Sequence, residues 1–139
     1  MFAEHISSEW EELFIHAKNA SVQAYAPYSQ FKVGAAILTS AGKIYTGCNV
    51  ENSSYGGTIC AERTAIVKAV SEGERIFIAL AVYVASSTIF SPCGICRQVL
   101  AEFSDDLVVI YGNDQQQQQI TIRELLPEKF FFPPKKTCQ

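Results

Sequence analysis

Residues 76–85 read IFIALAVYVA, an almost unbroken apolar run with Arg75 before it and Ser86 after it. A short, continuous apolar run with polar flanks is typical of a strand that other elements cover on both faces. Such a strand occupies the centre of a sheet that has helices on either side. The run therefore predicts the central strand of a layered α/β domain.

Helical and strand patterns alternate on both sides of this run. Apolar side chains recur at three- and four-residue steps from Trp10 to Ala20, which predicts an amphipathic helix that Pro27 ends. Gly42 marks a turn between two strand patterns, as in a hairpin. In chain order, the predicted elements are a helix over 8–25, strands over 32–39 and 43–46, a helix over 59–71, the central strand, a helix over 94–103 and a strand over 107–111.

This order predicts a three-layer α/β/α fold with a mixed sheet of roughly five strands, of which the hairpin is the antiparallel part. Residues 120–122, after a tract of five glutamines, are either an edge strand or the start of a short helix that ends at Leu126. No internal repeat or linker divides the chain. We therefore expect one domain over residues 1–139, with an unusual C-terminal tail over 127–139.

The composition narrows the class of protein. The chain has 139 residues, of which 48% are apolar and 18% charged, as in a globular domain rather than a disordered chain. Its formal charge is −3, whereas nucleic-acid-binding domains carry a basic excess, so no nucleic-acid partner is expected. No apolar run reaches the roughly 18 residues of a membrane span, and the polar residues 1–10 differ from a secretory signal. We expect a soluble cytoplasmic protein with no membrane partner.

The chain has five cysteines, an odd number that cannot all pair internally. Cys93 and Cys96 are three residues apart at the predicted start of one helix, and Cys60 stands near the start of another. Both helices follow strands, and helix starts at the carboxyl ends of strands line a common crevice. Three thiolates suit zinc and leave its fourth position open for water, as in catalytic sites. The pattern therefore predicts a catalytic zinc site.

Two charged residues follow Cys60 on the same predicted helix. Glu62 lies on the first turn, where its carboxylate reaches zinc-bound water and exchanges protons with it. Three thiolates on Zn²⁺ leave a net negative charge, which makes bound water less acidic. Arg63 offsets this charge by hydrogen-bonding the sulfurs, and the two helix N-termini act in the same direction.

Two other uses of the thiols remain open at this point. Cys93 and Cys96 alone match a thioredoxin-like redox pair, which leaves Cys60 and Glu62 without a role. A closed structural zinc site needs a fourth ligand, for which Cys48, His5 and His16 are the candidates.

Four motifs together resemble cytidine deaminase, and more narrowly its short, homotetrameric form with three cysteine ligands to zinc. They are GAA at 34–36, GCNVEN at 47–52, CAER at 60–63 and SPCGICRQ at 91–98. The CAE motif followed about 30 residues later by PCxxC is typical of zinc deaminases. The resemblance covers residues from about 26 to about 130.

The resemblance implies a role for each matching residue. Cys60, Cys93 and Cys96 hold Zn²⁺, Glu62 shuttles protons and contacts the base edge, and Arg63 and Gln98 lie beside the thiolates. Substrate is bound by four further residues: Asn49 and Glu51 at the ribose hydroxyls, Phe31 against the pyrimidine ring, and Ala61. In the family a C-terminal phenylalanine reaches a neighbouring subunit's site, and Phe130 is our choice among the three at 130–132.

The implied reaction is hydrolytic deamination of free cytidine and deoxycytidine to uridine and deoxyuridine plus ammonia, a step of pyrimidine salvage. A related deaminase with another substrate is the first alternative: a bare base, a nucleotide, an aminopyrimidine antibiotic or a base in RNA. Asn49 and Glu51 favour a ribose, and the negative charge disfavours a polynucleotide. The second alternative is a zinc- or nucleoside-binding protein without catalytic activity, against which the complete set of Cys60, Glu62, Cys93 and Cys96 argues.

Overall fold

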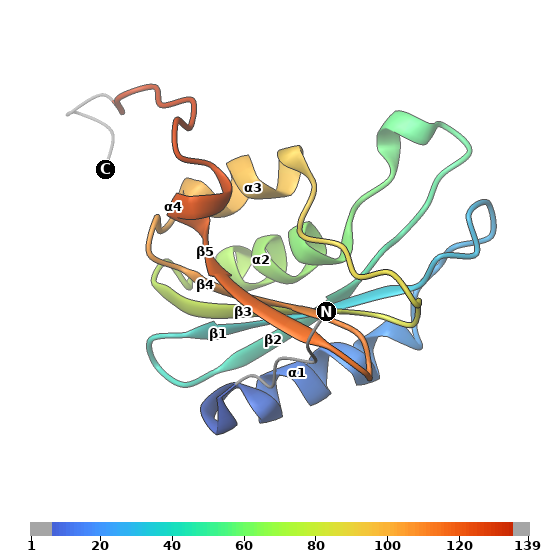
Figure 1. The fold of residues 1–139 in the computed structure, drawn as a ribbon. Coiled ribbons are helices and arrows are strands. Elements are labelled where there is room, and N and C mark those ends of the chain that lie inside the picture. The colour runs from blue at the N-terminus through green and yellow to red at the C-terminus, as the bar shows by residue number, and fades with distance from the viewer. Residues whose placement is uncertain (1–6, 135–139) are drawn as a thin grey trace.

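The computed structural model describes residues 7–134 as a five-stranded mixed sheet between helices (Figure 1). The strands lie in the order β2-β1-β3-β4-β5. The apolar run at 76–85 forms β3 at the centre, as predicted. In chain order, the elements are α1 (Ser8–Ser21), β1 (Val33–Thr39), β2 (Ile44–Cys48), the 3₁₀ helix η1 (Tyr55–Gly57), α2 (Ala61–Ser71), β3 (Phe77–Val84), α3 (Gly94–Ala101), β4 (Val108–Gly112), β5 (Gln117–Thr121) and α4 (Ile122–Leu125).

Strand directions bring three carboxyl ends to one edge of the sheet. β1 is antiparallel to both β2 and β3, β3 is parallel to β4, and β4 is antiparallel to β5. Strands β2, β3 and β4 therefore run in the same direction. The connections that follow β2 and β3 lead to α2 and α3, so both helices begin at this edge.

The helices cover the two faces of the sheet, which confirms the predicted three-layer α/β/α fold. Helix α1 lies on one face and packs Trp10, Leu13, Phe14 and Ala17 against alanines of β1 and β3. Helices α2 and α3 lie on the other face, and their buried residues pack on Ile37, Leu80, Val82 and Val109, among others. Gly34 permits the close approach of α1, since a Cβ there would lie 1.9 Å from the Ala17 carbonyl oxygen.

The structure shortens all three predicted helices, and it resolves the alternatives after the glutamine tract. Helix α1 ends at Ser21 rather than at residue 25, because the backbone of Tyr25 pairs instead with Asn49 and Glu51. Helix α2 begins at Ala61, with Cys60 as its N-cap. Helix α3 ends at Ala101 rather than at residue 103. The last three glutamines of the tract begin edge strand β5, and a capping box between Thr121 and Glu124 then starts α4, so both a strand and a short helix are present.

Within residues 7–134, no helix combines the length and the apolar character needed to cross a membrane. After α4 the chain has no further helix or strand up to residue 134, and two hydrogen bonds join it to α3, from Gln98 to the Phe130 carbonyl and from Lys129 to the Ala101 carbonyl. His5 and Cys138 lie outside the described residues.

Candidate active site

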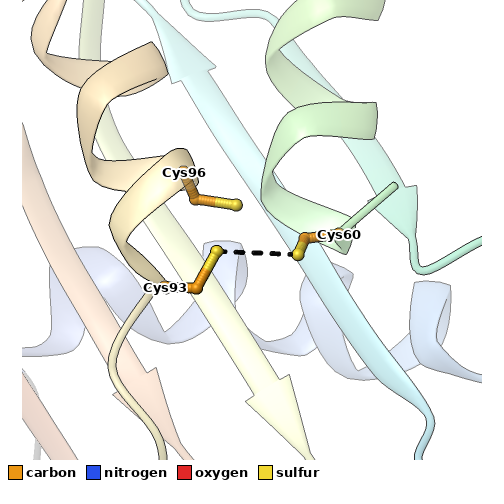
Figure 2. Close-up of side chains that lie close together, drawn as sticks. All are labelled: Cys60, Cys93 and Cys96. Atoms are coloured by element: carbon orange, nitrogen blue, oxygen red, sulfur yellow. Dashed lines mark hydrogen bonds between the residues drawn. The ribbon is translucent and has the colours of Figure 1, made fainter. Parts of the chain in front are cut away.

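The structure brings the three cysteines of the predicted zinc site together at the edge where α2 and α3 begin. Cys60 is the N-cap of α2, Cys93 is the N-cap of α3, and Cys96 lies on the first turn of α3. Figure 2 shows the three side chains pointing toward one another. The sulfurs of Cys60 and Cys93 are 3.8 Å apart, and all three sulfurs lie within 4.8 Å of one another.

This donor set fits zinc. Zn–S bonds of about 2.3 Å in a tetrahedron place two sulfurs about 3.8 Å apart, which matches the distance between Cys60 and Cys93. Within residues 7–134, no histidine, carboxylate or other cysteine joins this group, so neither Cys48 nor His16 is its fourth ligand. The third thiol also argues against a redox pair made of Cys93 and Cys96 alone. Three ligands with an open fourth position remain, as in catalytic zinc sites.

Charge around the sulfurs favours the thiolate form of Cys60. Hydrogen bonding from the Cys96 thiol and from Arg63 lowers the pKa of Cys60 to about 5. Arg63 donates to Cys60 Sγ at 3.4 Å, and its Nε is buried without a partner among the described residues. The pKa of Cys96 is raised by its hydrogen bond to Cys60 and by burial. Arg63 thus lies beside the sulfurs, where a guanidinium offsets their negative charge.

Glu62 points into the same site from the first turn of α2. Its side chain is only 5% exposed, although it lines the cavity described below. Burial is the main cause that raises its pKa to about 7. A carboxyl group with a pKa near neutral pH both accepts and donates protons readily, which suits a general acid and base.

A cavity of about 540 Å³ opens beside Cys60 and Cys93. Its lining includes both polar and apolar side chains. The polar lining is Ser29, Asn49, Glu51, Thr58, Glu62 and Ser91, and the apolar lining is Phe31, Val33, Ala61, Val82, Val84 and Phe90. A pocket of mostly apolar character with a few converging polar groups is the common form of a small-molecule site.

Asn49 and Glu51 line this cavity and also organise the segment that carries Phe31. Asn49 accepts a hydrogen bond from the Val33 amide at 2.9 Å and donates to the Phe31 carbonyl at 2.7 Å. Glu51 accepts bonds from the Tyr28 amide, the Ser29 amide and the Ser29 hydroxyl. These bonds leave one Asn49 amide hydrogen and further Glu51 lone pairs available to a ligand.

The cavity includes residues that the sequence analysis did not select. Phe90 and Ser91 come from the loop between β3 and α3, and Ser29 comes from the segment after α1. Phe90 stands three positions before Cys93, and this position next to the cysteine motif could have indicated that it lies at the site. For Ser29 the sequence offers no such signal, because its role depends on the approach of Glu51.

Neither Gln98, expected beside the thiolates, nor Phe130, expected at a neighbouring subunit's site, lines the cavity of the single chain. The Gln98 side-chain amide donates to the Phe130 carbonyl at 2.9 Å and does not line the cavity. Gln98 therefore holds the C-terminal segment on α3 and is not directed at the thiolates. Phe130 is 71% exposed and lies outside the cavity of its own chain.

Comparisons with known proteins agree with this site. A family model described as the cytidine and deoxycytidylate deaminase zinc-binding region matches residues 7–112. Cytidine deaminase of Sporosarcina psychrophila is 50% identical over 122 residues, which cover 86% of this chain and 90% of that protein. A probable cytidine deaminase of Dictyostelium discoideum is 50% identical over 123 residues, which cover 88% of this chain and 84% of that protein.

Solved structures give the same result. The crystal structure of cytidine deaminase from Burkholderia pseudomallei has a TM-score of 0.84 and 44% identity, covering 90% of this chain and all of that one. Cytidine deaminase from Mycobacterium tuberculosis has a TM-score of 0.77 and 39% identity, covering 91% of this chain and all of that one. The resemblance of the four motifs, the fold and the expectation of a deaminase are thus confirmed. This chain belongs to the cytidine deaminase family of hydrolytic enzymes.

Proposed function

We propose that this chain catalyses the zinc-dependent hydrolytic deamination of free cytidine and deoxycytidine to uridine and deoxyuridine plus ammonia, a step of pyrimidine salvage. One observation carries the proposal: three thiols converge, and two of them, Cys60 and Cys93, line one cavity with the buried Glu62 carboxyl, Asn49 and Glu51. The names of the relatives, which are cytidine deaminases, support the same substrate.

The Cys60, Cys93 and Cys96 thiolates would hold Zn²⁺. When bound, zinc supplies the positive charge that lowers the pKa of a water molecule and prepares it for attack on the ring. Arg63 and the N-termini of α2 and α3 stabilise the thiolates electrostatically.

Glu62 carries the proton transfers. Its carboxylate takes a proton from the attacking water and delivers it to N3 of the pyrimidine, while the water oxygen bonds to C4. Glu62 then takes the remaining proton from the new C4 hydroxyl and transfers it to the amine on C4. The C4–N bond breaks, ammonia leaves, and the ring becomes that of uridine.

The combination of polar and apolar residues that line the cavity favours a nucleoside. Asn49 and Glu51 together donate to and accept from a pair of sugar hydroxyls. Phe31 and Ala61 provide apolar contact for the pyrimidine ring. No lysine or arginine lines the cavity in the part of the chain that the structure describes, and this favours a free 5′-hydroxyl over a 5′-phosphate.

The proposal extends to partners and location. We expect the chain to act in the cytoplasm as a homotetramer on a small-molecule nucleoside, with no nucleic acid or membrane as partner. The exposure of Phe130 supports a contact with a neighbouring subunit.

Ultraviolet absorbance tests the reaction, since the ring spectrum changes when the amine becomes a carbonyl. Zinc-loaded protein is mixed with cytidine, deoxycytidine, cytosine or CMP. We expect a change with cytidine and deoxycytidine, none with cytosine or CMP, and loss of turnover after zinc removal by a chelator. Turnover of CMP or cytosine in preference to cytidine contradicts the proposed substrate, and no turnover at full zinc occupancy contradicts the proposed reaction.

A further inference from the structure

The loop between β3 and α3, residues 85–92, contributes Phe90 and Ser91 to the lining of the cavity and is anchored at both ends. At its start, the Ser86 carbonyl accepts a 2.6 Å hydrogen bond from the side chain of Asn113, which is only 3% exposed. At its end, Arg97 donates to the Ser91 hydroxyl at 2.8 Å and to the Pro92 carbonyl at 2.7 Å. These bonds fix the backbone at Ser91 and Pro92, directly after Phe90.

Phe90 packs directly against Phe31, and both rings line the cavity. The two ring centroids are 5.4 Å apart, and the ring planes are inclined at 88°, an edge-to-face arrangement that aromatic pairs prefer. The backbone on either side of Phe31 is fixed independently, because Asn49 bonds the Phe31 carbonyl and the Val33 amide. Two separate segments therefore each present one phenyl ring to the same space.

Packing of the protein core does not account for this arrangement. Phe90 is 49% exposed, so much of its ring surface is free for a ligand. It lines the cavity together with Cys60, Cys93 and Glu62. Because the two phenyl rings are nearly perpendicular, a planar heteroaromatic ligand can stack on the face of one phenyl ring. The edge of the ligand then contacts the other phenyl ring.

We propose that Phe90 is a substrate-binding residue that forms, with Phe31, a two-sided aromatic corner for the pyrimidine ring. This inference rests on the proposed function, in which the ligand is a cytosine nucleoside. Phe90 acts on binding rather than on proton transfer, since its side chain has no ionisable group. Phe31 and Phe90 orient the pyrimidine ring, and Glu62 carries out the proton transfers.

Steady-state kinetics of Phe90 variants with cytidine test this inference. In Phe90→Ala we expect KM for cytidine and the inhibition constant of uridine to rise together by about three- to tenfold. The expected change in kcat is below about twofold, because only binding is affected. Phe90→Tyr keeps the aromatic ring and should restore most of the affinity. Phe90→Leu keeps apolar bulk without the ring and should restore less.

Ile95→Ala is the matched control. Ile95 is an exposed apolar residue of α3 that does not line the cavity, so its removal should leave KM and kcat unchanged. Zinc content is measured in every variant. Unchanged KM and uridine inhibition in Phe90→Ala, equal rescue by Leu and Tyr, or loss of zinc from Phe90→Ala would each overturn the inference. A wild-type chain that does not turn over cytidine contradicts the proposed function instead, so the two failures are distinguishable.

Discussion

Arg97 Nε donates a 2.7 Å hydrogen bond to the carbonyl of Pro92, the residue directly before Cys93. The same guanidinium donates to the Ser91 hydroxyl and, at 2.9 Å, to the Leu125 carbonyl at the end of α4. One side chain thus ties the backbone around a zinc-ligand candidate to the C-terminal part of the fold. The planar fork of arginine allows three such bonds in fixed directions.

Arg97→Ala is therefore expected to destabilise the fold and the cysteine cluster. The Pro92 and Leu125 carbonyls lose their donor, and a buried acceptor left without a partner costs about 1–3 kcal/mol. We expect the free energy of unfolding in urea to fall by about 2–4 kcal/mol and zinc to pass faster to a chelator. Arg97→Lys should recover little, since a single ammonium does not reproduce the fork.

Arg75→Ala provides the control for this substitution. Arg75 also donates to backbone carbonyls, those of Val70 and Glu74, but it is exposed and lies in the connection between α2 and β3. Its removal should cost less than about 0.5 kcal/mol, as for most surface changes. Equal losses in the two variants would show that Arg97 has no special role.

Glu62→Gln separates metal binding from proton transfer. Glutamine has nearly the same size as glutamate but does not accept the proton from water. We expect unchanged zinc content and a fall in kcat of about 10²–10⁴-fold, measured with cytidine by ultraviolet absorbance. Glu72→Gln, at the exposed C-terminal end of the same helix, should retain full activity. Comparable turnover in Glu62→Gln and the wild type would refute the assigned role.

The fold was predictable where periodicity reports burial directly. The unbroken run at 76–85 predicted the central strand, because both faces of β3 are covered. The glutamine tract was not assigned, since polar side chains carry no periodic signal. Its strand depends on pairing with β4 and on the turn in which Asn113 accepts bonds from the amides of Gln115 and Gln116. Neither the pairing of two strands nor the hydrogen bonds of a turn can be inferred from the hydropathy of the sequence.

The part of the site that could be predicted is the part defined by the spacing of residues in the sequence. Cys60, Glu62 and the pair at 93 and 96 follow helix starts, so their convergence follows from topology. Gln98 adjoins the same motif, but its side chain reaches the Phe130 carbonyl, which no spacing indicates. Phe90 becomes part of the cavity only because the loop before α3 approaches Phe31.

The Glu51 carboxylate makes a pH-dependent contribution to stability. Its hydrogen bond with the Ser29 hydroxyl, together with two backbone amides, holds the pKa of Glu51 below its usual range. A lowered pKa in the folded state stabilises the fold above the unfolded pKa of about 4.3, and this contribution is lost as pH falls through the folded pKa. Ser29→Ala should therefore destabilise the protein at pH 7 and progressively less below about pH 4, as measured by urea unfolding.

Ser53→Ala is the comparison for this pH series. Its hydroxyl shares a 2.7 Å hydrogen bond with the Tyr28 phenol, and this pair contains no carboxylate. The effect of Ser53→Ala should be independent of pH between 3 and 7. A pH-independent effect of Ser29→Ala as well would mean that the Ser29 hydroxyl does not stabilise the Glu51 carboxylate.

Phe130 and Phe132 allow a test of the proposed contact between subunits. Both side chains are largely exposed in the single chain, at 71% and 77%, so neither substitution to alanine should reduce stability. Phe130 is positioned by the bond from Gln98 to its carbonyl. We expect Phe130→Ala to lower kcat/KM for cytidine by about tenfold, the loss of one aromatic contact with substrate. Phe132→Ala should have no effect, and a loss confined to Phe132→Ala would show that the wrong phenylalanine was chosen.

Mixed oligomers then show whether Phe130 acts in its own subunit or in a neighbour. Phe130→Ala subunits keep Glu62, and Glu62→Gln subunits keep Phe130. If Phe130 completes a neighbouring site, mixing the two variants places an intact Phe130 beside an intact Glu62 in some sites, and activity should exceed the sum of the separate variants. No gain in oligomers that sedimentation velocity shows to be mixed tetramers would place Phe130 in its own subunit. Sedimentation as a monomer at micromolar concentration would contradict the tetramer itself, and with it any contact between sites.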